Sequence, residues 1–128
     1  MGAVGAITRR KVLIVDDNAD AALLLSMFLS AYGHETAVAY GGAEGLELAE
    51  AFRPEIVILD LGMPQMSGYE VAVAMRMLPR LATVYIAALT GWNDAKTREQ
   101  VIAAGFNKHL TKPANVEVVL DLIEHAIA

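Results

Sequence analysis

The hydrophobic positions along this chain form short β-branched runs that alternate with longer segments of helical periodicity. Five of the runs are predicted to be strands: 11–15, 35–39, 56–59, 84–89 and 107–110. Gly or Pro falls at most of the joints between these runs and the helical segments. Strands and helices that alternate in this way are typical of repeated βα units, which build a parallel sheet.

Each predicted strand is followed by a helical segment with recognisable ends. The helices are expected near 19–31, 43–52, from 67 to before Pro79, 94–104, and from 115 to the end. Asn18 or Asp20 is available to cap the first helix, and Ser67 with Glu70 forms a capping-box pattern. Five βα units predict an α/β fold of three layers around a doubly wound parallel sheet. Ligands of such sheets bind outside the carboxyl ends of the strands.

The bulk composition favours one soluble domain. With 128 residues the chain is near the commonest domain size, and no apolar run approaches the ~20 residues that span a bilayer. The formal charge of −5 and the scattered Lys and Arg residues argue against a nucleic-acid surface. The chain has no cysteine and its start lacks the apolar core of a signal peptide, so we expect a cytoplasmic protein. Residues 1–8 are expected to form a flexible tail and residues 9–128 the domain.

Polar side chains suited to chemistry stand where four of the predicted strands end. Asp16 and Asp17 follow the first strand, Asp60 the third, Thr90 the fourth and Lys112 the fifth. In a parallel sheet these ends share one edge, so the side chains are expected to converge on one shallow cleft. Three carboxylates this close cannot all stay ionised unless a cation reduces their repulsion. Oxygen ligands without His or Cys indicate a hard divalent ion such as Mg²⁺.

Asp60 is the carboxylate best placed to react. It ends the continuously apolar run 56–59, which is typical of a central strand, and a loop rich in Gly and Pro follows it. A carboxylate beside Mg²⁺ can attack phosphorus and form an aspartyl phosphate. Thr90 can then donate a hydrogen bond to the phosphoryl oxygens, and Lys112 can supply a positive charge.

Four segments of the chain carry a resemblance to a known family. They are VLIVDDN, ILDLGMPQMSGYE, ALTG and AAGFNKHLTKP. In order and spacing they resemble the receiver domain of two-component response regulators, over almost the whole chain from Lys11 onward. The string HLTKP is similar to receivers associated with hybrid histidine kinases. The resemblance implies a flavodoxin-like (βα)5 sandwich with strand order 2-1-3-4-5.

The resemblance also implies an activity and a metal site. A sensor histidine kinase or a histidine phosphotransfer protein would pass a phosphoryl group from its phosphohistidine to Asp60. Asp17, Asp60 and the backbone carbonyl of Gly62 would bind Mg²⁺ directly, and Asp16 would act mainly through a metal-bound water. The domain would be a phosphoacceptor in signalling and not an enzyme, with an intrinsic capacity for autodephosphorylation.

The resemblance further implies that some residues change position on phosphorylation. Thr90 would move toward the new phosphoryl group, Lys112 would pair with it, and the Lys112–Pro113 peptide bond would be cis. Receivers usually carry Tyr or Phe where this chain has His109. Either His109 is a rotamer switch that moves with Thr90, or it is a partly exposed histidine at the edge of the sheet. Phosphorylation would shift the face formed by the fourth helix, fifth strand and fifth helix.

Several remaining side chains carry expectations of their own. Trp92 either covers the site in part and slows hydrolysis of the phosphate, or packs over the loop after the fourth strand. Met63 and Met66 are expected to pack the loop after the third strand. His34 and His125 have no partner motif and are expected at the surface.

Two other function classes stay open at this stage. The first is a receiver-like binding module that signals without phosphate, although Asp60, Thr90 and Lys112 are all present. The second is a small phosphatase or nucleotide-binding enzyme, which the absence of G-x-G-x-x-G, P-loop and Asp-x-Asp motifs disfavours. If the chain is a phosphorylated receiver domain, we expect an unknown downstream protein as its partner and no contact with nucleic acid or membrane. We expect it to be either a monomer or a phosphorylation-dependent homodimer.

Overall fold

The computed structural model describes residues 9–126, so the expected tail, residues 1–8, lies outside the described residues. The strands are β1 (Lys11–Val15), β2 (Glu35–Ala39), β3 (Ile56–Asp60), β4 (Tyr85–Thr90) and β5 (Lys108–Thr111). The helices are α1 (Ala19–Ala31), α2 (Gly42–Phe52), α3 (Gly68–Met77), the 3-10 helix η1 (Pro79–Leu81), α4 (Ala95–Ala103) and α5 (Val116–His125). The alternation of strands and helices predicted from the hydrophobic pattern is therefore confirmed.

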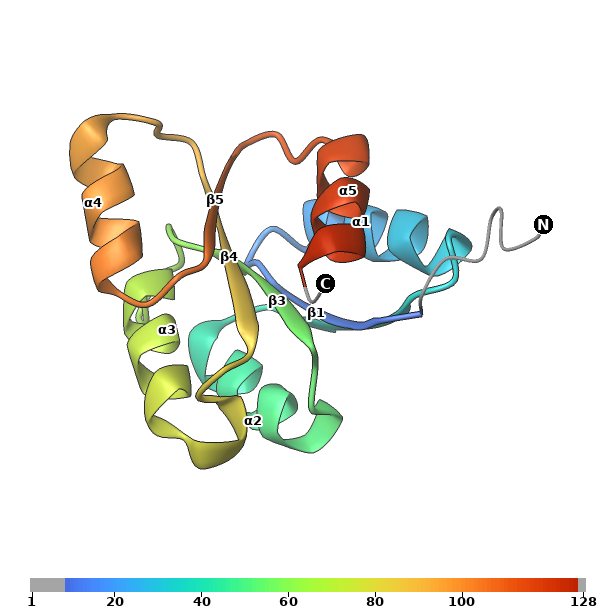
Figure 1. The fold of residues 1–128 in the computed structure, drawn as a ribbon, viewed down its shortest axis with the longest axis horizontal. Helices are drawn as coiled ribbons and strands as arrows, with labels where there is room; N and C mark the ends of the chain where they lie inside the picture. The colour runs from blue at the N-terminus through green and yellow to red at the C-terminus, as the bar shows by residue number, and fades with distance from the viewer. Residues whose placement is uncertain (1–8, 127–128) are drawn as a thin grey trace.

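All neighbouring strands pair in parallel, in the order β2-β1-β3-β4-β5. Figure 1 shows α1 and α5 on one face of the sheet and α2 and α3 on the other. Successive side chains of the inner strands point to opposite faces of the sheet and pack into two separate cores. Leu13 and Val57 join the core under α2 and α3, whereas Val12 and Ile56 join the core under α1 and α5. The predicted three-layer fold with order 2-1-3-4-5 is confirmed.

Local signals set most of the helix ends. The Asn18 side chain accepts the Ala21 N–H and caps α1, so Asn18 and not Asp20 is the cap. Ser67 and Glu70 form both hydrogen bonds of the predicted capping box before α3. The 3-10 helix η1 was not predicted. It begins at Pro79, which ends α3 but has the backbone angle that suits a new helical turn.

Two strand predictions were displaced by one residue. β4 runs to Thr90, because Thr90 is in register with Thr111 of β5, and β5 begins at Lys108. Asn107 stays outside the strand, and its side-chain oxygen accepts the Ile86 N–H at 2.8 Å. The Asn107 side chain thus takes the place of a strand carbonyl as the acceptor for the Ile86 N–H. A pattern of apolar residues does not predict such a contact.

The prediction that His34 lies at the surface is wrong. Only 5% of His34 is exposed, and its Nδ1 accepts a hydrogen bond from the backbone of Arg10, which is 24 residues away in sequence. His125 is exposed, as expected. Met63 is buried and Met66 packs against the same core, which confirms their role in packing the loop.

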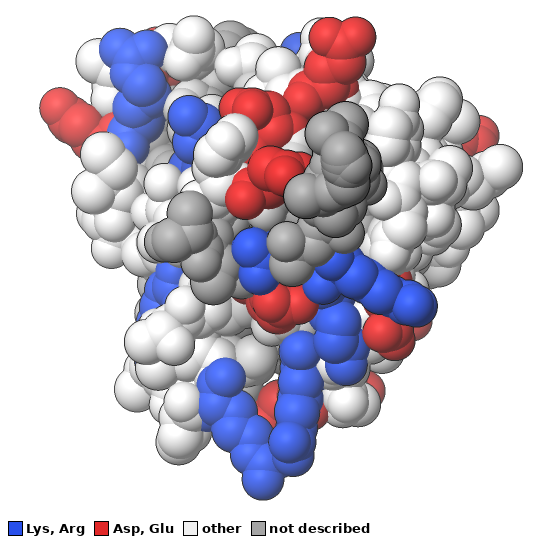
Figure 2. Space-filling model, turned by 45° about the vertical axis from the view of Figure 1, so that its right-hand side comes forward, with Lys and Arg blue, Asp and Glu red and all other residues white. Residues whose placement is uncertain are grey.

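The surface mixes charges of both signs. In the view of Figure 2, Lys and Arg side chains gather in the lower part, and acidic side chains lie next to them. None of the helices within residues 9–126 combines the length and the apolar character that a bilayer crossing requires.

Candidate functional site

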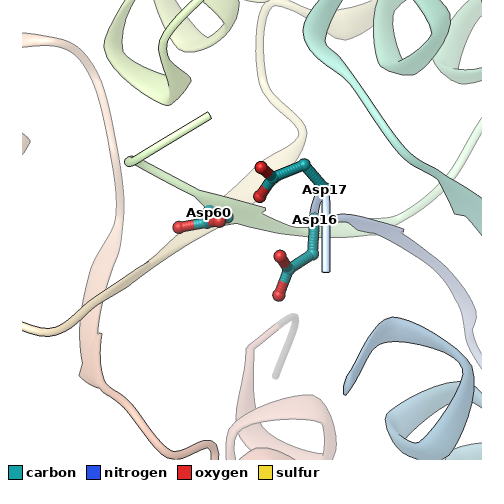
Figure 3. A group of neighbouring side chains, drawn as sticks. All are labelled: Asp16, Asp17 and Asp60. Atoms are coloured by element: carbon teal, nitrogen blue, oxygen red, sulfur yellow. The ribbon is translucent and has the colours of Figure 1, made fainter. Parts of the chain in front are cut away.

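The five side chains predicted to converge do so at the carboxyl edge of the sheet. Asp16 and Asp17 follow β1, Asp60 ends β3, Thr90 ends β4 and Lys112 follows β5. Each of the three aspartates offers one carboxylate oxygen, and these oxygens lie within 4.8 Å of one another (Figure 3). The arrangement follows from topology, because the carboxyl ends of parallel strands share one edge.

Asp60 is held by contacts to the loop that follows it and to β5. Its Oδ1 accepts the Gly62 N–H at 3.1 Å and lies 2.9 Å from Lys112 Nζ. Gly68, at the start of α3, packs directly against the Asp60 carbonyl, and a Cβ at this position would overlap it. A glycine is therefore needed for α3 to approach the end of β3 this closely. Asp60 itself is only 2% exposed.

Asp16 is buried beside Asp60, whereas Asp17 is exposed. Burial raises the pKa of Asp16 to about 6, and the negative charge of Asp60 acts in the same direction. The Asn18 N–H donates to Asp16 at 2.9 Å and opposes the shift, as does the charge of Lys112. Ionisation of Asp16 in this cleft is therefore less favourable than ionisation of an ordinary aspartate.

This donor set fits a small hard cation. Mg²⁺ prefers oxygen ligands, and one carboxylate oxygen from each of the three aspartates lies within 4.8 Å of the other two. All three groups offer oxygen, and no His or Cys belongs to this cluster within residues 9–126. Such a cation would also relieve the repulsion that raises the pKa of Asp16.

Lys112 brings a positive charge to the same cleft from β5. Burial lowers the pKa of its ammonium group, but the hydrogen bond and charge of Asp60 outweigh this, and the net shift is upward. Lys112 is therefore charged at any physiological pH. The following peptide bond, Lys112–Pro113, is cis, as the resemblance implied.

Thr90 and His109 are joined through the backbone of Trp92. The Trp92 N–H donates to Thr90 Oγ1 at 3.2 Å, and the Trp92 carbonyl oxygen lies 2.9 Å from His109 Nε2. His109 is partly exposed at the edge strand β5. His109 thus lies at the edge of the sheet, a position that both interpretations of this residue share, and the hydrogen bond ties that edge to the β4–α4 loop.

The Trp92 side chain lies at the rim of the cleft. It is 72% exposed, so both interpretations of this ring, as a cover of the site or as packing over the loop, stay predictions. Together with Asp60, Thr90 and Lys112 it lines a cavity of about 480 Å³, which Tyr69 on α3 also lines. A large ring is therefore available in the same cavity as the Asp60 carboxylate.

A groove leads away from the site along α1, and the sequence analysis did not predict it. Its volume is about 430 Å³, and it runs from Asp16 and Lys112 past Leu24 and Phe28. Exposed apolar side chains continue along this helix, namely Leu23, Leu24, Met27, Phe28 and Tyr32. The signal was present in the sequence, because residues 21–33 contain no charged side chain, unlike a usual solvent-facing helix.

Comparison with known families and structures agrees with this geometry. The profile of the family described as response regulator receiver domain matches residues 12–124. The chemotaxis protein CheY4 of Vibrio cholerae superposes with a TM-score of 0.86 at 32% sequence identity. The match covers 91% of this chain and 97% of CheY4.

Curated relatives differ in length. An uncharacterized 14.6 kDa protein of Leptolyngbya boryana is 32% identical over 92% of this chain and 90% of its own length. The DNA-binding dual master transcriptional regulator RpaA of Synechocystis is 31% identical over 86% of this chain but only 46% of RpaA. The chain thus spans about half the length of that regulator. Profile, fold and sequence similarity together show that this chain belongs to the response regulator receiver domains.

Proposed function

We propose that Asp60 accepts a phosphoryl group from a phosphohistidine donor, in the cytoplasm, and that this switches the domain between two states. An Asp60 oxygen attacks phosphorus, the phosphorus–nitrogen bond of the donor breaks, and the histidine nitrogen keeps the electron pair. The observation that carries the proposal is the contact of 2.9 Å between Lys112 Nζ and Asp60 Oδ1, inside a cluster of three carboxylates.

Each residue of the cleft has a separate role in this proposal. Asp17, Asp60 and the Gly62 carbonyl would hold Mg²⁺, and Asp16 would reach it mainly through water. When bound, the ion neutralises charge on the phosphoryl oxygens. Lys112 neutralises the charge that faces β5, and the Thr90 hydroxyl donates to the remaining oxygen.

The donor is expected to dock along α1. A sensor histidine kinase or a histidine phosphotransfer protein must bring a histidine ring to Asp60, and the groove beside Leu24 and Phe28 opens directly onto the site. A surface of apolar side chains without charges suits a packed helix–helix contact. The same site allows intrinsic autodephosphorylation, since water can attack the phosphorus from the open side where Trp92 stands.

The switch would begin at Thr90. Movement of its hydroxyl toward the phosphoryl group breaks the hydrogen bond from the Trp92 N–H, and the Trp92 carbonyl is held by His109. The β4–α4 loop and β5 therefore have to rearrange together. This biases the face made by α4, β5 and α5 between two packings, which an output protein or a second copy of the chain can distinguish.

Intact-mass analysis tests the proposal. The protein is incubated with Mg²⁺ and acetyl phosphate, and one added phosphate is expected on the wild type and none on Asp60→Asn. EDTA in place of Mg²⁺ is expected to abolish the gain. A wild type that gains no phosphate would instead favour the alternative, a receiver-like module that binds partners without phosphorylation.

A further inference from the structure

His34 is a buried histidine that the proposed phosphotransfer does not use. It follows Gly33, whose φ of 95° turns the chain after α1, and it directly precedes β2. It is 5% exposed, and its Nδ1 accepts the backbone N–H of Arg10 at 3.2 Å. Because that N–H is a donor, Nδ1 carries no proton, so the contact requires the neutral ring.

Arg10 connects His34 to two neighbouring strands. Its carbonyl accepts the Glu35 N–H at 2.9 Å, and its guanidinium lies 3.3 Å from a Glu55 carboxylate oxygen. The other Glu55 oxygen accepts the Lys11 N–H at 3.0 Å. The chain that leads into β1 is therefore held from both sides, by His34 before β2 and by Glu55 before β3.

Charged groups on three separate segments of the chain affect the pKa of His34. Burial lowers the pKa of His34 below its ordinary value of 6.5. The Glu124 carboxylate on α5 opposes this shift, the Arg10 guanidinium adds to it, and Glu55 opposes it.

Protonation would change the hydrogen-bonding partner of His34. With a proton on Nδ1 the ring can no longer accept the Arg10 N–H, its charge repels the Arg10 guanidinium, and it is attracted to Glu124. Arg10 Nε is buried without a hydrogen-bond partner among residues 9–126. Release of Arg10 would bring water to this donor, which offsets part of the lost contacts.

We propose that His34 is a proton-operated latch, in which the neutral ring holds the chain before β1 and the protonated ring releases Arg10 and turns toward Glu124 on α5. The latch stands at the amino edge of the sheet, opposite Asp60, so it is independent of the proposed phosphotransfer. Its direction follows from linkage. Because the pKa of His34 in the folded state is lowered, the closed latch is stable at neutral pH and is lost as the pH falls below the ordinary value of 6.5.

Amide exchange with water, measured by NMR, tests the latch at its own hydrogen bond. The Arg10 amide is the reporter, and its exchange rate is corrected for the intrinsic effect of pH. Between about pH 7.5 and about pH 5 its protection is expected to fall at least threefold in the wild type, while that of the β1 amides stays constant. The His34 ring resonances are followed in the same samples and are expected to show the same midpoint.

Three variants separate the latch from a general effect of acid. His34→Asn keeps an acceptor near the Nδ1 position but does not titrate, so the pH dependence is expected to disappear. Glu124→Gln removes the partner of the protonated ring, so the midpoint is expected to move to lower pH. His125→Gln, an exposed histidine on the same helix, is the matched control and is expected to behave like the wild type.

Three results would overturn the latch. The first is wild-type Arg10 protection that does not change with pH. The second is a His34→Asn variant that keeps the full pH dependence. The third is a difference between the midpoints of the His34 ring and the Arg10 amide, a comparison that needs only the wild type and therefore does not depend on whether the variants fold.

Discussion

Lys112 Nζ lies 2.9 Å from Asp60 Oδ1, although Asp60 ends β3 and Lys112 follows β5, two strands that are separated by β4 in the sheet. The Asp60 carboxyl is almost fully buried, whereas the Lys112 side chain is 38% exposed. The Asp60 carboxylate is thus paired with a side chain that is itself accessible from solvent. This relationship makes Lys112 the first residue to test.

Replacement of Lys112 by Met is expected to slow phosphate uptake by on the order of 10²-fold, because a positive charge that faces the developing negative charge is lost. The rate is measured by intact mass with Mg²⁺ and acetyl phosphate. Lys108→Met, at an exposed lysine of the same strand, is the control and is expected to leave the rate unchanged. An equal rate for Lys112→Met and the wild type would remove Lys112 from the mechanism.

Asp16 and Asp17 are expected to differ in their effects on metal and stability. Asp17→Asn should weaken Mg²⁺ binding more than Asp16→Asn, since Asp17 is assigned as the direct ligand. Ionised Asp16, with a pKa of about 6, costs on the order of 1–3 kcal/mol at neutral pH in the open cleft, so Asp16→Asn is expected to stabilise the metal-free protein. Isothermal titration and urea unfolding in EDTA measure the two effects. Greater loss of Mg²⁺ affinity in Asp16→Asn would reverse the assignment.

Mg²⁺ affinity is expected to depend on pH through the same carboxyl group. The raised pKa means that a proton competes with the cation as the pH falls through about 6, so binding weakens there. Calorimetric titrations at several pH values check this, and Asp16→Asn should flatten the dependence. A binding constant that stays level between pH 7 and pH 5 would show that Asp16 does not bear on the site.

Trp92→Ala is expected to shorten the lifetime of the phosphorylated state several-fold, because the exposed ring borders the cavity from which water attacks. The decay of the phosphorylated mass after removal of the donor gives the rate. Trp92→Phe keeps a large ring at the rim and is expected to retain most of the lifetime. An unchanged rate in Trp92→Ala would mean that the ring does not limit access.

A charge placed in the α1 groove is expected to slow phosphoryl transfer from a protein donor but not from acetyl phosphate. Leu24→Glu should reduce phosphoryl transfer from a phosphorylated histidine protein about tenfold or more, since the carboxylate would be buried in a helix–helix contact. Uptake from acetyl phosphate should not change, because this donor needs no docking surface. Met77→Glu, exposed on α3, is the control. Equal loss with both donors would point to misfolding instead of docking.

Much of this protein follows from local patterns in its sequence. Short β-branched apolar runs and segments of helical periodicity predict all five strands and all five α-helices, because burial on one or both faces dictates which positions are apolar. The capping box at Ser67 and Glu70 is equally local. The site residues can be predicted as well, since the carboxyl ends of parallel strands meet at one edge and bring Asp16, Asp60 and Lys112 together.

Other features depend on contacts between distant residues and were decided by the tertiary structure. His34 is buried, and the donor to its Nδ1 is the Arg10 N–H, 24 residues away. The hydrogen bond between His109 and the Trp92 carbonyl, and the groove beside α1, likewise depend on how separate elements pack. Sequence alone therefore determined the helices and strands and the carboxyl edge of the sheet, where the candidate site residues converge. Only the tertiary structure decided which polar side chains are buried and which partner each one finds, because burial and hydrogen bonding depend on neighbours that the local sequence does not specify.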